Sequence, residues 1–186
     1  MAGSSWPGGF GVTRELALRR AAALDGKTHT EVEGRLLPSP RKVFSDIRAY
    51  LGRRSQEMDT RNDPYGLLKL FEDNSRALIV LGPTIDKGPT PQHFHFDSGA
   101  RLSFGLTLRE RDDGAQLVSF RYHYQLPAAR SPEYFRFDLN EAQHEDPLSE
   151  PRCHLHPGLE GVRIPISLHD PFDILDRIFF VLEGRV

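Results

Sequence analysis

Residues 120–125 read FRYHYQ and alternate aromatic and polar side chains without a break. Strict alternation is typical of a half-buried β-strand, because successive side chains in a strand point to opposite faces of the sheet. We therefore expect Phe120, Tyr122 and Tyr124 to face a hydrophobic core. Arg121 and His123 then lie on the opposite face, which carries a cation and an imidazole.

The turn before this strand sets its expected register. Asp112-Asp113-Gly114 separates it from a second alternating segment, which predicts a β-hairpin. If Arg111 pairs with Ala115, every pair on one face is apolar or aromatic: Leu108 with Val118, Leu106 with Phe120, Phe104 with Tyr122, and Leu102 with Tyr124. A slip of one residue would put these side chains on opposite faces, so the pattern favours this register.

Two later segments are expected to extend the polar surface. Residues 134–139 and 152–156 alternate again, with Phe135, Phe137, Leu139, Cys153 and Leu155 on the apolar side. The three strands would then share one polar face, which is the candidate site: Arg121, His123, Arg136, Asp138, Arg152, His154 and His156.

Composition limits the function classes. The 186 residues include 24 basic and 26 acidic side chains, with a formal net charge of -2, so the chain as a whole is no general polyanion binder. The single cysteine, Cys153, excludes an intrachain disulfide and a cysteine-rich zinc site, and fits a cytoplasmic protein. No apolar segment is long enough to span a bilayer, so we expect no membrane partner.

The order of elements predicts an α+β fold. Ser39-Pro40 and Asp170-Pro171 are typical helix starts, each combining a capping side chain with proline at the first helical position. Residues 67–71 are expected to form a short helical turn, and residues 77–81, 92–97 and 161–166 to form strands. The result is an antiparallel meander sheet with helices packed on one face and an N-terminal helical extension.

Three regions follow from this interpretation. Residues 1–11 are rich in glycine and serine and predict a flexible tail. Residues 12–66 form a helical N-terminal region, and residues 67–186 form the antiparallel sheet domain with its C-terminal helix.

The segment at residues 122–125, Tyr-His-Tyr-Gln, resembles a strand of the TumE-like toxin family, the toxin member of a two-gene bacterial toxin–antitoxin pair. Further matching pieces follow in the order seen in that family: Phe137-Asp138, His144, and Pro151 with His154 and His156. The resemblance covers roughly residues 67–182. It implies a small bacterial toxin-like domain that acts on RNA or the translation apparatus and is restrained by an antitoxin protein.

Metal-independent cleavage of RNA is the first chemical interpretation of the polar face. Such cleavage needs a base, an acid and cations for the phosphoryl group, and histidine suits both proton roles because its pKa is about 6.5. The candidate catalytic residues are His123, His154 and His156, with Asp138 orienting an imidazole. The candidate phosphate ligands are Arg121, Arg136 and Arg152, because guanidinium matches phosphate geometry. Tyr65 and Tyr134 are candidate stacking surfaces.

Two other interpretations stay open. His154 and His156 alternate in a strand and could bind a metal ion together with His144 and Asp138, and His93-x-His95 is a second such pair. Alternatively, the polar face is a non-enzymatic surface of cross-strand charge pairs that binds a protein. We expect no cofactor, and the candidate partners are RNA, an antitoxin and a second copy of the chain as a homodimer.

Overall fold

The computed structural model describes residues 37–54, 64–72, 77–81, 93–128, 130–141, 152–159, 161–167 and 170–184. The predictions for residues 1–11, for residues 12–36 and for His144 concern residues outside these ranges. The side chain of Tyr65 lies outside them as well.

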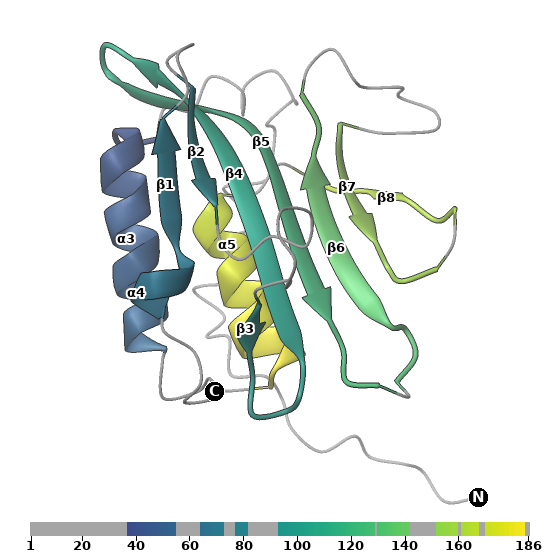
Figure 1. Ribbon diagram of the computed structural model, residues 1–186. Coiled ribbons are helices and arrows are strands. Elements are labelled where there is room, and N and C mark those ends of the chain that lie inside the picture. Colours follow the sequence, from purple (N-terminus) through teal and green to yellow (C-terminus); the bar gives the residue numbers. More distant parts are fainter. Residues whose placement is uncertain are drawn as a thin grey trace, which may run out of the picture.

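An antiparallel sheet forms the centre of the fold (Figure 1). Its strand order is β1-β2-β4-β5-β6-β7-β8, with β3 paired to one end of β4. The strands are β1 (Lys69–Glu72), β2 (Ala77–Leu81), β3 (Phe94–His95), β4 (Arg101–Arg111), β5 (Gly114–Gln125), β6 (Tyr134–Leu139), β7 (Cys153–His156) and β8 (Ile164–Pro165). The predicted α+β class with an antiparallel sheet is therefore confirmed.

The helices are α3 (Pro40–Arg53), α4 (Pro64–Leu67), α5 (Pro171–Asp176) and the π-helical η2 (Arg177–Leu182). Both predicted helix starts are confirmed. The Ser39 hydroxyl accepts a hydrogen bond from the Lys42 amide at 3.4 Å, and the Asp170 carboxylate accepts one from the Phe172 amide at 2.8 Å. These bonds satisfy amide groups that have no partner inside the helix.

The hairpin register is confirmed over most of its length and wrong near the turn. Leu106 pairs with Phe120 and Ser103 with His123, as the alternation predicts. Leu108, however, pairs with Leu117, because a β-bulge lies at Thr107/Leu108. Arg111 pairs with Gly114 rather than Ala115, so the turn is one residue tighter than expected. The bulge absorbs that extra residue and keeps the aromatic residues facing the core.

Other element boundaries differ from the prediction. Residues 69–72 form strand β1 instead of a helical turn, because β2 offers them a pairing edge from Leu81 to Leu78. The strands expected at residues 92–97 and 161–166 shrink to the two-residue strands β3 and β8. Short apolar segments are ambiguous between helix and strand until their tertiary neighbours are known.

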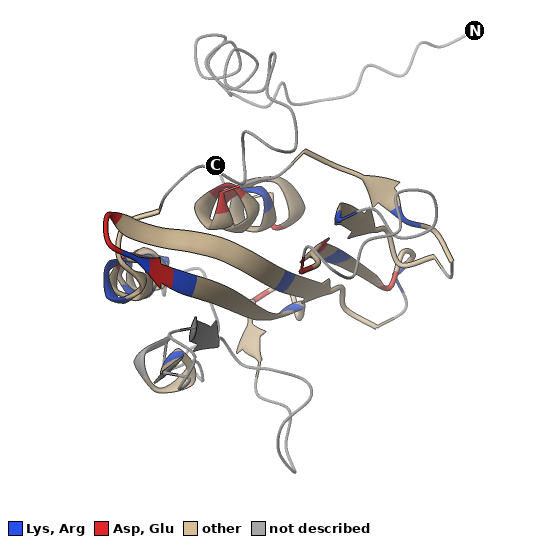
Figure 2. Cartoon of the chain, turned by 90° about the horizontal axis from the view of Figure 1, so that it is seen from above, with Lys and Arg blue, Asp and Glu red and all other residues tan. Residues whose placement is uncertain are grey.

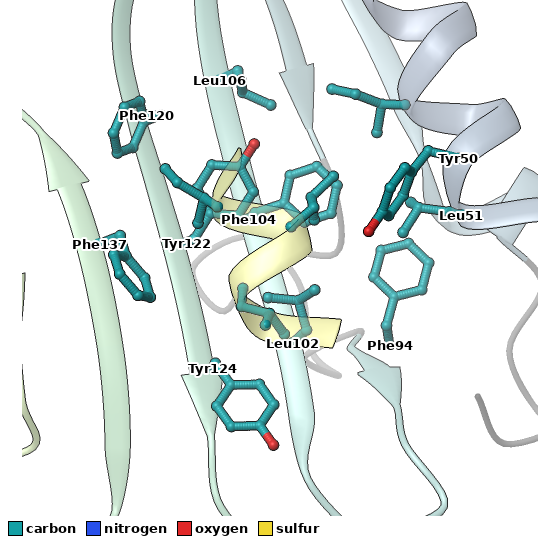
Figure 3. Packing of buried hydrophobic residues seen from close by; sticks show 14 of the residues in the cluster. Tyr50, Leu51, Phe94, Leu102, Phe104, Leu106, Phe120, Tyr122, Tyr124 and Phe137 are labelled. Atoms are coloured by element: carbon teal, nitrogen blue, oxygen red, sulfur yellow. The ribbon is translucent and has the colours of Figure 1, made fainter. Parts of the chain in front are cut away.

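Helices cover the apolar face of the sheet. In Figure 1 the C-terminal helical segment, α5 with η2, lies behind the sheet. In the turned view of Figure 2 it lies along one side of the sheet. Tyr122 stacks on Phe104 with ring centroids 5.1 Å apart, and its hydroxyl donates to the Pro171 carbonyl at 3.2 Å. Such a stack contributes about 0.5–1.5 kcal/mol beyond the burial of its area. These contacts fix α5 to the central strands. Figure 3 shows Phe104, Tyr122 and the other buried side chains that surround them.

Helix α3 belongs to the same core. Val43, Ile47 and Leu51 are buried in the cluster that contains the sheet aromatics. The Tyr50 hydroxyl donates to Asp176 at 2.8 Å, and its ring meets Phe179 edge-on with centroids 5.7 Å apart. Helix α3 therefore completes the hydrophobic core of the sheet domain.

Charges of both signs are distributed along the described chain. Figure 2 shows basic and acidic positions interspersed along the β4–β5 hairpin and on the terminal helix. None of the helices in the described ranges has both the length and the hydrophobicity needed to cross a membrane.

Candidate site on the polar face of the sheet

The sheet brings the three predicted strands side by side. In one row across the sheet, His123 pairs with Arg136, which pairs with His156. In the next row, Arg121 pairs with Asp138, which pairs with His154. Paired residues in adjacent strands share a face, so these six side chains belong to one surface.

Asp138 is the centre of this group. Its carboxylate is buried, with 4% of the side chain exposed. Arg136 Nε donates to Oδ2 at 2.7 Å, and Arg121 Nε donates to Oδ1 at 3.3 Å. The Nε2 atoms of His156 and His154 lie 3.2 and 3.7 Å from Oδ2. A buried carboxylate requires partners such as these two guanidinium groups, because an unpaired buried charge is costly.

The two histidines of β7 face each other. Their Nε2 atoms are 2.9 Å apart, and Arg136 Nη2 lies 2.8 Å from His156 Nε2. Arginine only donates hydrogen bonds, so His156 accepts through Nε2 and carries its own hydrogen on Nδ1. Burial first, and then the charge of Arg136, lower the pKa of His156 to about 4. His156 is therefore neutral at pH 7.

The two imidazoles differ in access. His154 is fully buried, whereas His156 keeps 7% of its surface exposed. A substrate group can reach only an exposed atom, so His156 is the better placed of the pair to touch one. His154 contacts His156 and lies behind it.

His123 offers a different kind of imidazole. Burial, followed by the charge of Arg136, lowers the pKa of His123 below its usual value. Its ring meets the Tyr134 ring edge-on with centroids 5.1 Å apart. Within the described part of the chain, its buried Nε2 atom has no hydrogen-bond partner. A neutral imidazole with an unused ring nitrogen can take up a proton.

The arginines are not equivalent. The Arg121 side chain is 59% exposed, and the Arg136 side chain is 28% exposed. The Nε atom of Arg152 donates to the main-chain carbonyl of Asn140 at 3.2 Å. Arg121 therefore presents the most accessible guanidinium of the Asp138 ion-pair network, while the contact of Arg152 anchors the end of β7.

His93 joins this surface, although the sequence suggested only a separate His-x-His pair. Its charge contributes to the lowered pKa of His123, and its own pKa is lowered by burial and by Arg101. His93 lies on this surface because β3 pairs with β4. His95 is opposite Arg101, on the side of the sheet that carries Ser103 and His123. The alternation that continues from residues 92–97 across the turn into β4 is the signal that could have placed it.

Comparisons with protein-family models, with curated proteins and with solved structures find no match for this chain. The resemblance to TumE-like toxins therefore stays a prediction.

Proposed function

We propose that this protein is a toxin-like cytoplasmic bacterial protein that cleaves RNA at its polar face without a metal ion. The observation that carries the proposal is the position of His123. Its buried, unpartnered Nε2 atom belongs to a neutral imidazole in the row next to Arg121 and in the same row as Arg136. A base beside cations is what attack on a phosphodiester requires.

His123 acts as the general base in this scheme. Its Nε2 atom is buried in the free chain, so substrate binding must first expose it. The exposed Nε2 atom then takes the proton of a ribose 2′-hydroxyl, and the 2′-oxygen forms a bond to phosphorus. The bond from phosphorus to the 5′-oxygen breaks, which leaves a 2′,3′-cyclic phosphate on one product. The lowered pKa keeps His123 unprotonated at neutral pH, so the base is ready before the substrate binds.

Arg121 and Arg136 bind the phosphate. The exposed Arg121 guanidinium can meet two phosphate oxygens at once, and Arg136 lies between His123 and His156 in the register of the sheet. Negative charge that develops on the phosphoryl oxygens is stabilised by both groups.

His156 supplies the proton for the 5′-oxygen. The charge of Arg136 contributes to its low pKa, and a bound phosphate places a negative charge that opposes this effect. Phosphate binding therefore favours the protonated form of His156 when it is needed. In the protonated form, the Nε2 hydrogen of His156 can donate to Asp138 Oδ2, 3.2 Å away, which orients the ring. The buried His154 also contacts it, with 2.9 Å between the two Nε2 atoms.

The test is cleavage of a short RNA by the purified chain in buffer with EDTA. We expect strand scission with a 2′,3′-cyclic phosphate end, and a loss of about 100-fold or more in the His123→Ala variant. Gln125→Ala is the matched control, because Gln125 is an exposed residue on the same strand and the same side as His123. Equal cleavage by the parent chain and His123→Ala, at equal folded content by circular dichroism, would refute the base assignment.

Growth on controlled induction in bacteria tests the toxin part of the proposal. We expect the parent chain to arrest growth and the His123→Ala variant of equal solubility to relieve the arrest. Growth without arrest under the parent chain, at matched expression, would contradict the toxin role.

A second candidate is a non-enzymatic surface that binds a protein such as an antitoxin. The ion pairs of Asp138 with Arg121 and Arg136 favour it, because they explain these residues as a cross-strand network. This alternative predicts no RNA scission and small, graded losses of partner affinity when exposed residues such as Arg121 are changed.

A further inference from the structure

We propose that Asp138, His154 and His156 form a binding site for a divalent transition-metal ion of the Zn²⁺ type. All three side chains are buried, and their donor atoms lie within 4.8 Å of one another. They come from the adjacent strands β6 and β7, where His154 pairs with Asp138. This inference does not rest on the proposed RNA cleavage. The two roles of His156 exclude each other, because a bound ion takes the lone pair of its Nε2 atom, so the proposed cleavage belongs to the chain without a metal ion.

The distances among the donor atoms fit an ion. The two Nε2 atoms are 2.9 Å apart, and they lie 3.7 Å (His154) and 3.2 Å (His156) from Asp138 Oδ2. A circle drawn through three atoms with these separations has a radius of about 1.9 Å, just below the 2.0–2.2 Å bond lengths of zinc to nitrogen and oxygen. An ion slightly off the plane of the three atoms would contact all of them without movement of the three atoms themselves.

The hydrogen bonds of this cluster lack one acceptor. His156 Nε2 has one lone pair, yet Arg136 Nη2 at 2.8 Å and His154 Nε2 at 2.9 Å both approach it. One lone pair cannot accept two strong hydrogen bonds. A metal ion resolves the conflict, because it takes the lone pairs of both imidazoles and an oxygen of the carboxylate.

Arg136 is an internal competitor for this site. Its guanidinium donates to Asp138 Oδ2 at 2.7 Å and approaches His156 Nε2 at 2.8 Å, two of the three atoms that the ion needs. The side chain is 28% exposed, so it has a route toward solvent when an ion enters. Metal affinity is then set by competition with Arg136, and removal of its charge must strengthen binding.

The donor set indicates which ions fit. Two imidazoles with one carboxylate suit zinc, cobalt, nickel or iron, whereas magnesium and calcium prefer sites made of oxygen alone. Three protein ligands leave at least one coordination position for water or another group.

The experiment uses the full chain, stripped with chelator and titrated with Zn²⁺ and Co²⁺, with Mg²⁺ as the negative control. Calorimetry gives stoichiometry and affinity, and the visible absorption of Co²⁺ reports coordination by protein ligands. We expect one ion per chain, and at least about tenfold weaker binding in His154→Ala and His156→Ala. His95→Ala is the matched control, since it removes a histidine of the other His-x-His pair.

Arg136→Met tests the metal site even if a ligand variant fails to fold. We expect it to bind Zn²⁺ at least about tenfold more tightly than the parent chain, because the competing cation is gone. Unchanged or weaker binding in Arg136→Met would overturn the proposal, as would binding that survives in His156→Ala. Metal binding with no RNA cleavage in EDTA would refute the proposed function alone, and cleavage in EDTA with no metal binding would refute this inference alone.

Discussion

Replacing Asp138 by asparagine should destabilise the fold strongly, because it leaves the cluster around the carboxylate without its negative charge. The Asp138 side chain is 4% exposed and the Arg136 side chain is 28% exposed, so this ion pair is largely shielded from water. Removing one partner of a fully buried pair costs about 3–5 kcal/mol. The partial exposure of Arg136 reduces the expected loss to about 2–3 kcal/mol, because solvent screens a partly exposed charge. Arg121, at 59% exposure, adds under about 1 kcal/mol.

The assay is urea unfolding at pH 7, followed by far-ultraviolet circular dichroism, with EDTA present to exclude metal ions. A double-mutant cycle with Arg136→Met isolates the pair. We expect the double variant to lose less stability than the sum of the single losses, by about 1–3 kcal/mol, because the unpaired guanidinium is gone. Asp113→Asn in the exposed hairpin turn is the control and should change stability by less than about 0.5 kcal/mol.

Additive losses would refute this reasoning. If Asp138→Asn and Arg136→Met acted independently, the contact at 2.7 Å would contribute no coupling energy. A loss below about 1 kcal/mol in Asp138→Asn would show that solvent or a rearranged side chain compensates the arginines.

Three further predictions concern pH and local geometry. The folded chain resists protonation of His156 between about pH 6.5 and 4 while the unfolded chain binds that proton, so stability should fall as the pH is lowered through this window. The urea midpoint should shift less between pH 7 and pH 4.5 in His156→Gln than in the parent chain, and an equal shift would contradict the assignment. Asp170→Ala removes the bond to the Phe172 amide and should cost about 1 kcal/mol by thermal unfolding, whereas Asp170→Asn should retain most of it. Gly158→Ala should destabilise by about 2 kcal/mol or more, because φ is +69° and the added Cβ would lie 2.6 Å from the Tyr134 carbonyl oxygen; a neutral effect in chemical denaturation would show that this loop shifts freely.

The sequence predicts the polar face well because alternation is a strong local signal. Once His123, Arg136 and His156 each occupy the polar phase of a strand, adjacency of the strands places them in one row. The meander order was expected from the succession of strands along the chain. The pairing of β2 with β4 past β3 could not be derived, since it depends on long-range contacts that no short segment encodes. The bulge near Leu108 was missed for a similar reason. A turn that is one residue shorter shifts the pairing beside it, and the bulge restores the original register further along the strands. The alternation of side chains therefore does not reveal the shorter turn.

The chemistry of the site was less predictable than its location. Residue types alone made His154 and His156 equal candidates for proton transfer, whereas burial separates them. The contact of Arg136 with both Asp138 and His156 depends on side-chain rotamers, which alternation does not fix. Local polarity pointed to the surface, and packing decides which atoms on it are free to react.

The end strands of the sheet also bear on how copies of the chain meet. Strand β8 consists of Ile164–Pro165, and proline has no amide hydrogen to offer to an incoming strand. At the other end, the four-residue β1 begins with Lys69, a charge typical of edges that resist further pairing. A homodimer built by joining two sheets into one is therefore disfavoured at both ends. Self-association, where it occurs, should use side-chain surfaces, and the solubility of the isolated chain should benefit from the same feature.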